Sequence, residues 1–220
     1  MEADIITIDG PTSSGKNSVG FLLAEKLGYQ YIDTGMIYRV GTLLVLKNNI
    51  SLGSGEEIAN VFKNLNLEIK SADGILRIFN EGDDLTDKLH NPNVTEKVPV
   101  VAAIKKVREI TKIIQRNLGQ AKNTVMTGRD IGSEIFPEAL HKFFLTASVT
   151  VRAKRRFDQL VKIDPSVKYE QVYQSMLQRD KKDSTREISP LRVPKGAFVI
   201  DNSKLTVLQT VEEMLKEIHA

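Results

Sequence analysis

The chain has 220 residues, of which 41% are hydrophobic and 27% charged, a composition typical of a soluble globular protein. Its net charge of +3 is too small to indicate a protein that coats nucleic acid, and the lack of cysteine excludes disulfides and cysteine-ligated zinc. No stretch approaches the roughly 20 apolar residues that cross a bilayer, and the chain does not open on a signal-like segment. We therefore expect a cytoplasmic monomer without nucleic-acid or membrane partners.

Near the N-terminus, the apolar run Ile5–Ile8 leads into a loop bracketed by glycines, Gly10–Gly15, and then to Lys16. Small residues let backbone N–H groups come close to a phosphate, and the positive end of a following helix adds to the attraction. Apolar residues at helical spacing predict that helix over Lys16–Leu27. The segment therefore predicts a phosphate-binding loop, in preference to a glycine-rich turn that only joins a strand to a helix.

The strict form of this loop, G-x-x-x-x-G-K-[ST], fails at Asn17, and the hydroxyl arrives one residue later at Ser18. The Ser18 hydroxyl is then expected to reach Mg²⁺ or a phosphate, while Lys16 faces the β- and γ-phosphate oxygens. The predicted nucleotide-binding residues of this segment are Gly10, Pro11, Thr12, Ser13, Ser14, Gly15, Lys16, Asn17 and Ser18.

Strands and helices alternate along most of the remaining chain. Short apolar runs predict strands at Tyr29–Ile32, Thr124–Thr127, His141–Thr146 and Ala197–Ile200. Helical spacing predicts helices over about 36–46, 100–118 and 206–218, and another that begins near 148. This order predicts an α/β fold with a five-stranded parallel sheet, in which ligands bind at the carboxyl ends of the strands.

The middle of the chain interrupts this alternation. Leu65–Ile69 and Ile75–Phe79 alternate apolar and polar residues, and Ser71–Gly74 between them is a good hairpin turn. We therefore predict an inserted subdomain at 60–97 and a core made of 1–59 and 98–220.

Together with the phosphate loop, Tyr31–Arg39 and Thr127–Gly132 resemble the bacterial-type cytidylate kinases, a family of nucleoside monophosphate kinases. The resemblance covers nearly the whole chain, and further matching segments are Val107–Glu109, Phe144–Ser148 and Arg179–Arg186. It implies a P-loop kinase core, an insert that binds the acceptor, and a mobile lid at about 154–189. It also implies Mg²⁺-dependent transfer of the γ-phosphoryl group of ATP to CMP or dCMP, in pyrimidine nucleotide metabolism.

The resemblance also assigns residues to the nucleotide that accepts the phosphoryl group: Thr34, Tyr38, Arg39, Arg108, Arg129 and Asp130. Arg39 is expected to grip the acceptor phosphate, because a guanidinium matches phosphate oxygens in a fork. The residues alone leave alternatives open. Thr34 is also a candidate helix N-cap, Arg108 a candidate for a solvated helix face, and Asp130 a candidate structural partner of Arg129.

The catalytic residues implied by the resemblance are Lys16, Arg129, Arg179, Asp183 and Arg186. Arginines that close from a lid would stabilise the charge of the transferred phosphoryl group, with Asp183 orienting a neighbour. Arg155 is assigned to the donor nucleotide, with the lid root as the alternative. The polar run that contains the lid residues is also consistent with a merely solvated helix or loop.

Several residues depart from the family pattern, namely Ser13, Asn17, His90, Pro99, Ala102 and Lys182. Ser13 stands where the family usually has glycine, and costs ~1 kcal/mol or more if the loop needs a positive φ. Pro99 and Ala102 stand where serines are usual, one of which helps to read the base. Phosphorylation of another nucleoside monophosphate such as UMP, a non-catalytic nucleotide-binding switch and an inactive homologue therefore remain as alternatives.

Overall fold

The structure is a computed structural model that describes residues 3–72 and 75–219. Asp73 and Gly74, the last two residues of the predicted hairpin turn Ser71–Gly74, lie outside the described residues, so that turn stays a prediction.

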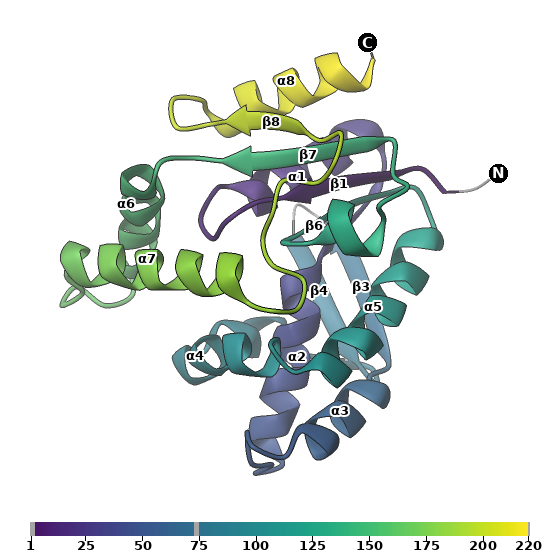
Figure 1. Ribbon diagram of the computed structural model, residues 1–220, viewed down its shortest axis with the longest axis vertical. Helices are drawn as coiled ribbons and strands as arrows, with labels where there is room; N and C mark the ends of the chain where they lie inside the picture. The colour runs from purple at the N-terminus through teal and green to yellow at the C-terminus, as the bar shows by residue number, and fades with distance from the viewer. Residues whose placement is uncertain (1–2, 73–74, 220) are drawn as a thin grey trace.

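The core is a five-stranded sheet with the order β2-β6-β1-β7-β8, in which every neighbouring pair is parallel. Its strands are β1 (Ile5–Asp9), β2 (Gln30–Asp33), β6 (Thr124–Gly128), β7 (His141–Thr146) and β8 (Phe198–Asp201). The predicted fold class is thus confirmed (Figure 1). The first strand lies in the middle, so the chain moves outward from β1 in both directions, and ligands bind at such a reversal of strand order.

Both faces of the sheet are covered, which explains why its strands are almost continuously apolar. One face packs on α1 (Lys16–Leu27) and α8 (Val207–Ile218), where Ile6, Ile8 and Leu23 are fully buried. The other face packs on the single-turn π-helix η2 (Ile131–Ile135) and α5 (Lys105–Gln120), around residues such as Met126 and Phe136.

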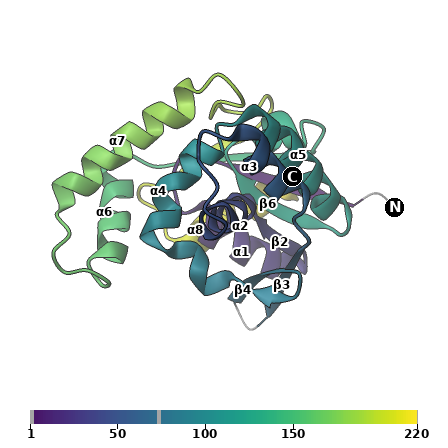
Figure 2. The same ribbon diagram turned by 90° about the horizontal axis from the view of Figure 1, so that it is seen from below.

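A helical layer with its own small sheet lies beyond the β2 side of the core (Figures 1 and 2). It contains α2 (Thr34–Lys47), α3 (Gly55–Lys63), the 3₁₀ helix η1 (Thr86–His90) and α4 (Pro92–Val101). Its antiparallel sheet has the strands β3 (Leu67–Ala72), β4 (Ile75–Asn80) and β5 (Asp83–Asp84). The predicted hairpin is confirmed as β3–β4, and β5 was not predicted because two residues carry no alternation.

The prediction of one long helix over 100–118 is wrong: α4 ends at Val101 and α5 begins at Lys105. Val101, Ile104 and Val107 keep helical spacing across the break because all three pack in one apolar cluster. Pro99 lies inside α4, two residues before the helix ends at Val101. Because proline has no backbone N–H, one hydrogen bond of the helix is missing there. The proposed boundaries at 60 and 97 fall inside α3 and α4, and the division into core and insert stays a prediction.

On the β7 side, α6 (Val149–Leu160) and α7 (Tyr169–Thr185) pack against each other and project from the sheet, and an extended segment returns from α7 to β8 (Figure 1). Ser148 is the N-cap of α6, and its side chain accepts a hydrogen bond from the N–H of Val151. Among the described residues, no helix has the length and apolar character needed to cross a membrane.

Candidate active site

The phosphate loop leaves the carboxyl end of β1 and packs tightly against the backbone of the neighbouring strand β7. A Cβ at Gly10 would lie 2.1 Å from the carbonyl oxygen of Leu145, so only glycine fits there. Gly15 has a φ of 89° where the loop enters α1, a conformation that glycine adopts without strain. The Lys16 ammonium lies back over the loop and donates to the carbonyl of Pro11 at 3.2 Å.

Ser13 adopts the left-handed conformation, with a φ of 58°. The sequence raised this question, and the structure confirms that the loop needs a positive φ at this position. A non-glycine residue there costs ~1 kcal/mol or more.

Side chains on α6, after β8 and at the end of β2 form hydrogen bonds with residues of the loop. Asn202, after β8, donates its amide to the carbonyl of Ser14 at 2.9 Å. Arg155 on α6 donates to the same carbonyl at 3.3 Å and to the carbonyl of Asn202 at 2.9 Å. At the start of α1, Asn17 donates to the Asp33 carboxylate at 2.5 Å, and Ser18 is exposed. The predicted loop residues and Arg155 therefore lie together.

The predicted acceptor residues Thr34, Tyr38 and Arg39 lie on α2. Thr34 donates to the carbonyl of Thr127 at 2.8 Å and is not the N-cap, because Asp33 takes that position and accepts from the N–H of Gly35. The Tyr38 hydroxyl lies 2.8 Å from that of Thr111.

Arg39 reaches across to the insert, where one guanidinium nitrogen donates to the carbonyl of Leu89 at 2.9 Å and to the hydroxyl of Thr95 at 2.8 Å. Burial lowers the pKa of Arg39 below its ordinary value. A buried cation of this kind is stabilised when an anion binds beside it.

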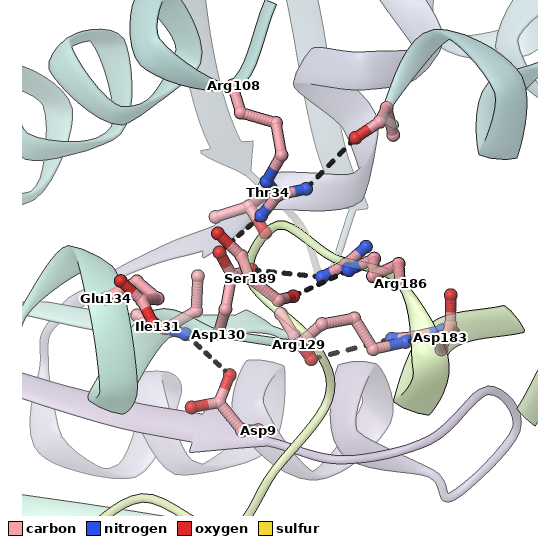
Figure 3. Close-up of polar contacts among 12 residues, drawn as sticks. Asp9, Thr34, Arg108, Arg129, Asp130, Ile131, Glu134, Asp183, Arg186 and Ser189 are labelled. Atoms are coloured by element: carbon pink, nitrogen blue, oxygen red, sulfur yellow. Dashed lines mark hydrogen bonds and ion pairs between the residues drawn. The ribbon is translucent and has the colours of Figure 1, made fainter. Parts of the chain in front are cut away.

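Arg108 and Asp130 form a buried ion pair beneath these residues (Figure 3). Arg108 is 7% exposed, which rules out the solvated helix face, and the partner of Asp130 is Arg108 instead of Arg129. Arg186, from the segment after α7, lies 3.8 Å from the other oxygen of the same carboxylate. Asp130 is therefore shared by a core arginine and a lid arginine.

Arg129 points the opposite way and donates to the Asp183 carboxylate on α7 at 2.9 Å (Figure 3). Burial raises the pKa of Asp183, but the charge and hydrogen bond of Arg129, together with the charges of Arg179 and Arg186, outweigh it, so the pKa lies below its ordinary value. This ion pair joins the end of β6 to α7, which lies in the predicted lid.

Cations from the phosphate loop, the end of β6 and the lid converge on one region. Burial lowers the pKa of Lys16 well below its ordinary value, and the charges of Arg129 and Arg179 lower it further. Burial likewise lowers the pKa of Arg179 to about 10, and Arg129 is again the next cause. Buried cations that repel one another are stabilised by an anion of high charge, such as a polyphosphate.

The sequence did not single out two residues that organise this region. Arg152 on α6 pairs in a fork with Asp180 on α7, at 3.0 and 2.6 Å, and also donates to the carbonyl of Thr12 at 3.3 Å. Asp9, the last residue of β1, accepts hydrogen bonds from the N–H groups of Ile131 and Gly132. Arg152 lies in a basic helical run and Asp9 directly before the loop motif, and nothing in either pattern indicates partners so distant in sequence.

Comparisons with known proteins identify the family of this chain. Residues 6–220 match the family described as cytidylate kinase. The chain is 45% identical over 213 residues to the cytidylate kinase of Caldanaerobacter subterraneus subsp. tengcongensis, covering 97% of this chain and 93% of the relative. It is 38% identical to the cytidylate kinase of Bacillus subtilis, covering 97% and 95%.

Solved structures support the fold alone. A shikimate kinase from Bacteroides thetaiotaomicron superposes with a TM-score of 0.51 at 11% identity, covering 100% of both chains. An uncharacterized protein from Eubacterium ventriosum superposes with a TM-score of 0.52 at 13% identity, covering 98% of both chains. With a family match over nearly its full length, this chain belongs to the cytidylate kinase family.

Proposed function

We propose that this protein transfers the γ-phosphoryl group of ATP to CMP or dCMP, forming ADP and CDP or dCDP. The observation that carries the proposal is the convergence of Lys16, Arg129 and Arg179, with further buried cations at Arg39 and in the Arg108–Asp130 pair. A loop that binds one nucleotide needs one cation to neutralise phosphate charge. Two nucleotides whose phosphates face each other need cations beside the phosphates of both.

The reaction needs no general base in this site. An oxygen of the CMP phosphate is already anionic, and it attacks the γ-phosphorus while the bond from that phosphorus to the bridging oxygen of ADP breaks. Charge spreads over the transferred oxygens, where Lys16, Arg129 and the lid arginines Arg179 and Arg186 would stabilise it. Asp183 would hold Arg129 in position, since the two are already paired at 2.9 Å.

Mg²⁺ fits the donor side of this site. Ser18 presents an exposed hydroxyl on the first turn of α1, next to the loop that would hold the phosphates. The described residues contain no group of three or more metal-ligating side chains, as expected for Mg²⁺ that binds mainly to nucleotide oxygens and water. Bound there, the ion would neutralise β- and γ-phosphate charge, with Ser18 as its protein ligand.

The buried Arg108–Asp130 pair and the nearby Arg186 supply donors and an acceptor for cytosine or its sugar. Arg108 also donates to the carbonyl of Ala102 at 3.2 Å. The backbone at this position would therefore help to orient Arg108, although the serine of the family is missing. We further propose that the protein works as a cytoplasmic monomer without nucleic-acid partners.

Steady-state release of ADP, measured with CMP, dCMP, UMP and AMP in turn, tests the proposal. We expect kcat/KM for CMP and dCMP to exceed that for AMP by at least about 100-fold, because a buried polar pair left unmatched by the wrong base is costly. Equal rates with CMP and AMP would exclude the cytidine assignment. ATP binding without ADP release for any acceptor would instead favour the non-catalytic switch.

A further inference from the structure

Asp9 is fully buried at the point where the phosphate-loop strand ends. One of its carboxylate oxygens accepts the N–H of Ile131 and the other accepts the N–H of Gly132, each at 2.8 Å. Figure 3 shows Asp9 below the loop that carries Arg129 and Asp130, joined to Ile131 by a dashed line. The next residue along the chain, Gly10, already belongs to the phosphate loop.

The two amides that Asp9 holds follow directly after the two acceptor-side residues. Arg129 and Asp130 point in opposite directions, one to Asp183 on the lid and the other to Arg108 in the core. Their divergence depends on how the chain turns into η2, where the first N–H groups have no partner within the turn. A carboxylate that accepts two successive N–H groups fixes that turn, whereas a side chain with one acceptor cannot.

We propose that Asp9 is a positioning residue that ties the phosphate-loop strand to the 129–132 loop, and so places Arg129 and Asp130 for the acceptor nucleotide. The proposal rests on the proposed function for the identity of the acceptor. The phosphate loop, which would bind the donor ATP, begins one residue after Asp9. The 129–132 loop, which would bind the acceptor, is held by the Asp9 carboxylate. Asp9 is therefore the direct link between the two sites.

The charge state of Asp9 decides whether this link has two acceptors. Burial raises the pKa of Asp9 to about 7, and the Asp130 charge adds to this, while the two N–H groups and the Lys16 charge lower it. The facing groups therefore come from α1 and from the 129–132 loop. Below its pKa the carboxyl gains a proton and loses one acceptor, so the link weakens as the pH falls from 8 to 6.

The variant Asp9→Asn imitates the protonated form, because its amide presents one acceptor and one donor. Thr7→Val is the matched control: Thr7 is also fully buried on the same face of β1, and its hydroxyl has no hydrogen-bond partner among residues 3–72 and 75–219. At pH 8 we expect Asp9→Asn to raise KM for CMP about tenfold and KM for ATP less than about threefold, with Thr7→Val unchanged.

The pH profile separates positioning from a general loss of packing. CMP itself titrates near this pH, but equally for every variant, so the ratio of KM for CMP between Asp9→Asn and the unmodified protein is the readout. We expect that ratio to fall from about ten at pH 8 toward one at pH 6. A ratio that stays constant with pH, or equal increases in KM for CMP and ATP, would overturn the proposal.

An NMR titration of the unmodified protein tests the link without a variant and without turnover. The amide signals of Ile131 and Gly132 should shift with the same apparent pKa as the Asp9 carboxyl carbon. Amides that do not titrate with Asp9 would overturn the proposal even if Asp9→Asn fails to fold. Failure of the proposed function is distinct, because it would show as a lack of turnover of CMP by the unmodified protein.

Discussion

Single residues in the site are held in states that cost free energy until a ligand arrives. Lys16 is the clearest case, because burial and then Arg129 hold its pKa well below the ordinary value. Between its folded and unfolded pKa values the unfolded chain binds more protons, so this lysine lowers stability at pH 7, and the loss shrinks as the pH rises toward 10.

Lys16→Met should therefore separate stability from catalysis. We expect turnover of CMP to fall about 10³-fold, because a preorganised cation at the transferred phosphoryl group is lost. The free energy of unfolding at pH 7 should be equal or higher, with the advantage narrowing toward pH 10. Denaturant unfolding at several pH values and an ADP-release assay measure both, and unchanged turnover would refute the assignment of the phosphate loop.

Ser13→Gly tests the strain in the phosphate loop. Glycine relieves the left-handed φ of 58° but adds freedom to the unfolded chain, so we expect a net gain of up to about 1 kcal/mol in the free energy of unfolding. In a protein of this size that is a rise in Tm of about 2–4 °C. Ser14→Gly, at a neighbour without a positive φ, should lower Tm. Equal changes in the two variants would contradict the strain.

At the scale of secondary-structure elements, α6 and α7 are joined by one bidentate ion pair between Arg152 and Asp180. Arg152 on α6 is 4% exposed, and Asp180 on α7 holds it at 3.0 and 2.6 Å. The same arginine contacts the carbonyl of Thr12, so the fork sets where α7 lies relative to the phosphate loop.

Asp180→Asn should lower the free energy of unfolding by about 2 kcal/mol, because it leaves a buried guanidinium without its counter-charge. Asp158→Asn is the control on α6, since the Asp158 pair with Lys154 is exposed and should change stability by less than about 0.5 kcal/mol. Urea titrations compare the two variants. Losses of the same size would show that the fork does not anchor α7.

At the scale of the whole molecule, the proposed donor and acceptor sites use different parts of the fold. The donor loop follows β1, while Arg39 reaches from α2 to Leu89 and Thr95 in the insert. Each nucleotide should therefore stabilise the molecule separately, by about 2.7 kcal/mol at a concentration 100 times its Kd.

Thermal shift with each nucleotide alone tests this separation. In the unmodified protein we expect ATP and CMP each to raise Tm by about 5–10 °C at that concentration. Arg39→Gln should lose most of the shift with CMP and keep that with ATP, whereas Lys16→Met should do the reverse. Loss of both shifts in Arg39→Gln would mean that the two sites are not separate.

Much of the fold was predictable because its signals are local. The apolar runs that predicted the parallel strands reflect burial on both faces, and α1 ends at Leu27 as predicted, followed by Gly28 with a φ of 67°. The helix over 100–118 failed for a physical reason: Val101 and Val107 lie on two helices that pack in one cluster, so their spacing continues across the break.

The phosphate loop, the parallel sheet and the family resemblance were predictable without a structure, since these depend on residues close together in the chain. Tertiary structure alone decided which charges meet: Arg108 with Asp130, Arg129 with Asp183, and the Asp9 carboxylate with two amides of η2. Pairing across such sequence distances depends on strand order and register, which place the carboxyl ends of β1 and β6 side by side. No local pattern carries that information, because the energies that select one partner over another arise only after burial removes water.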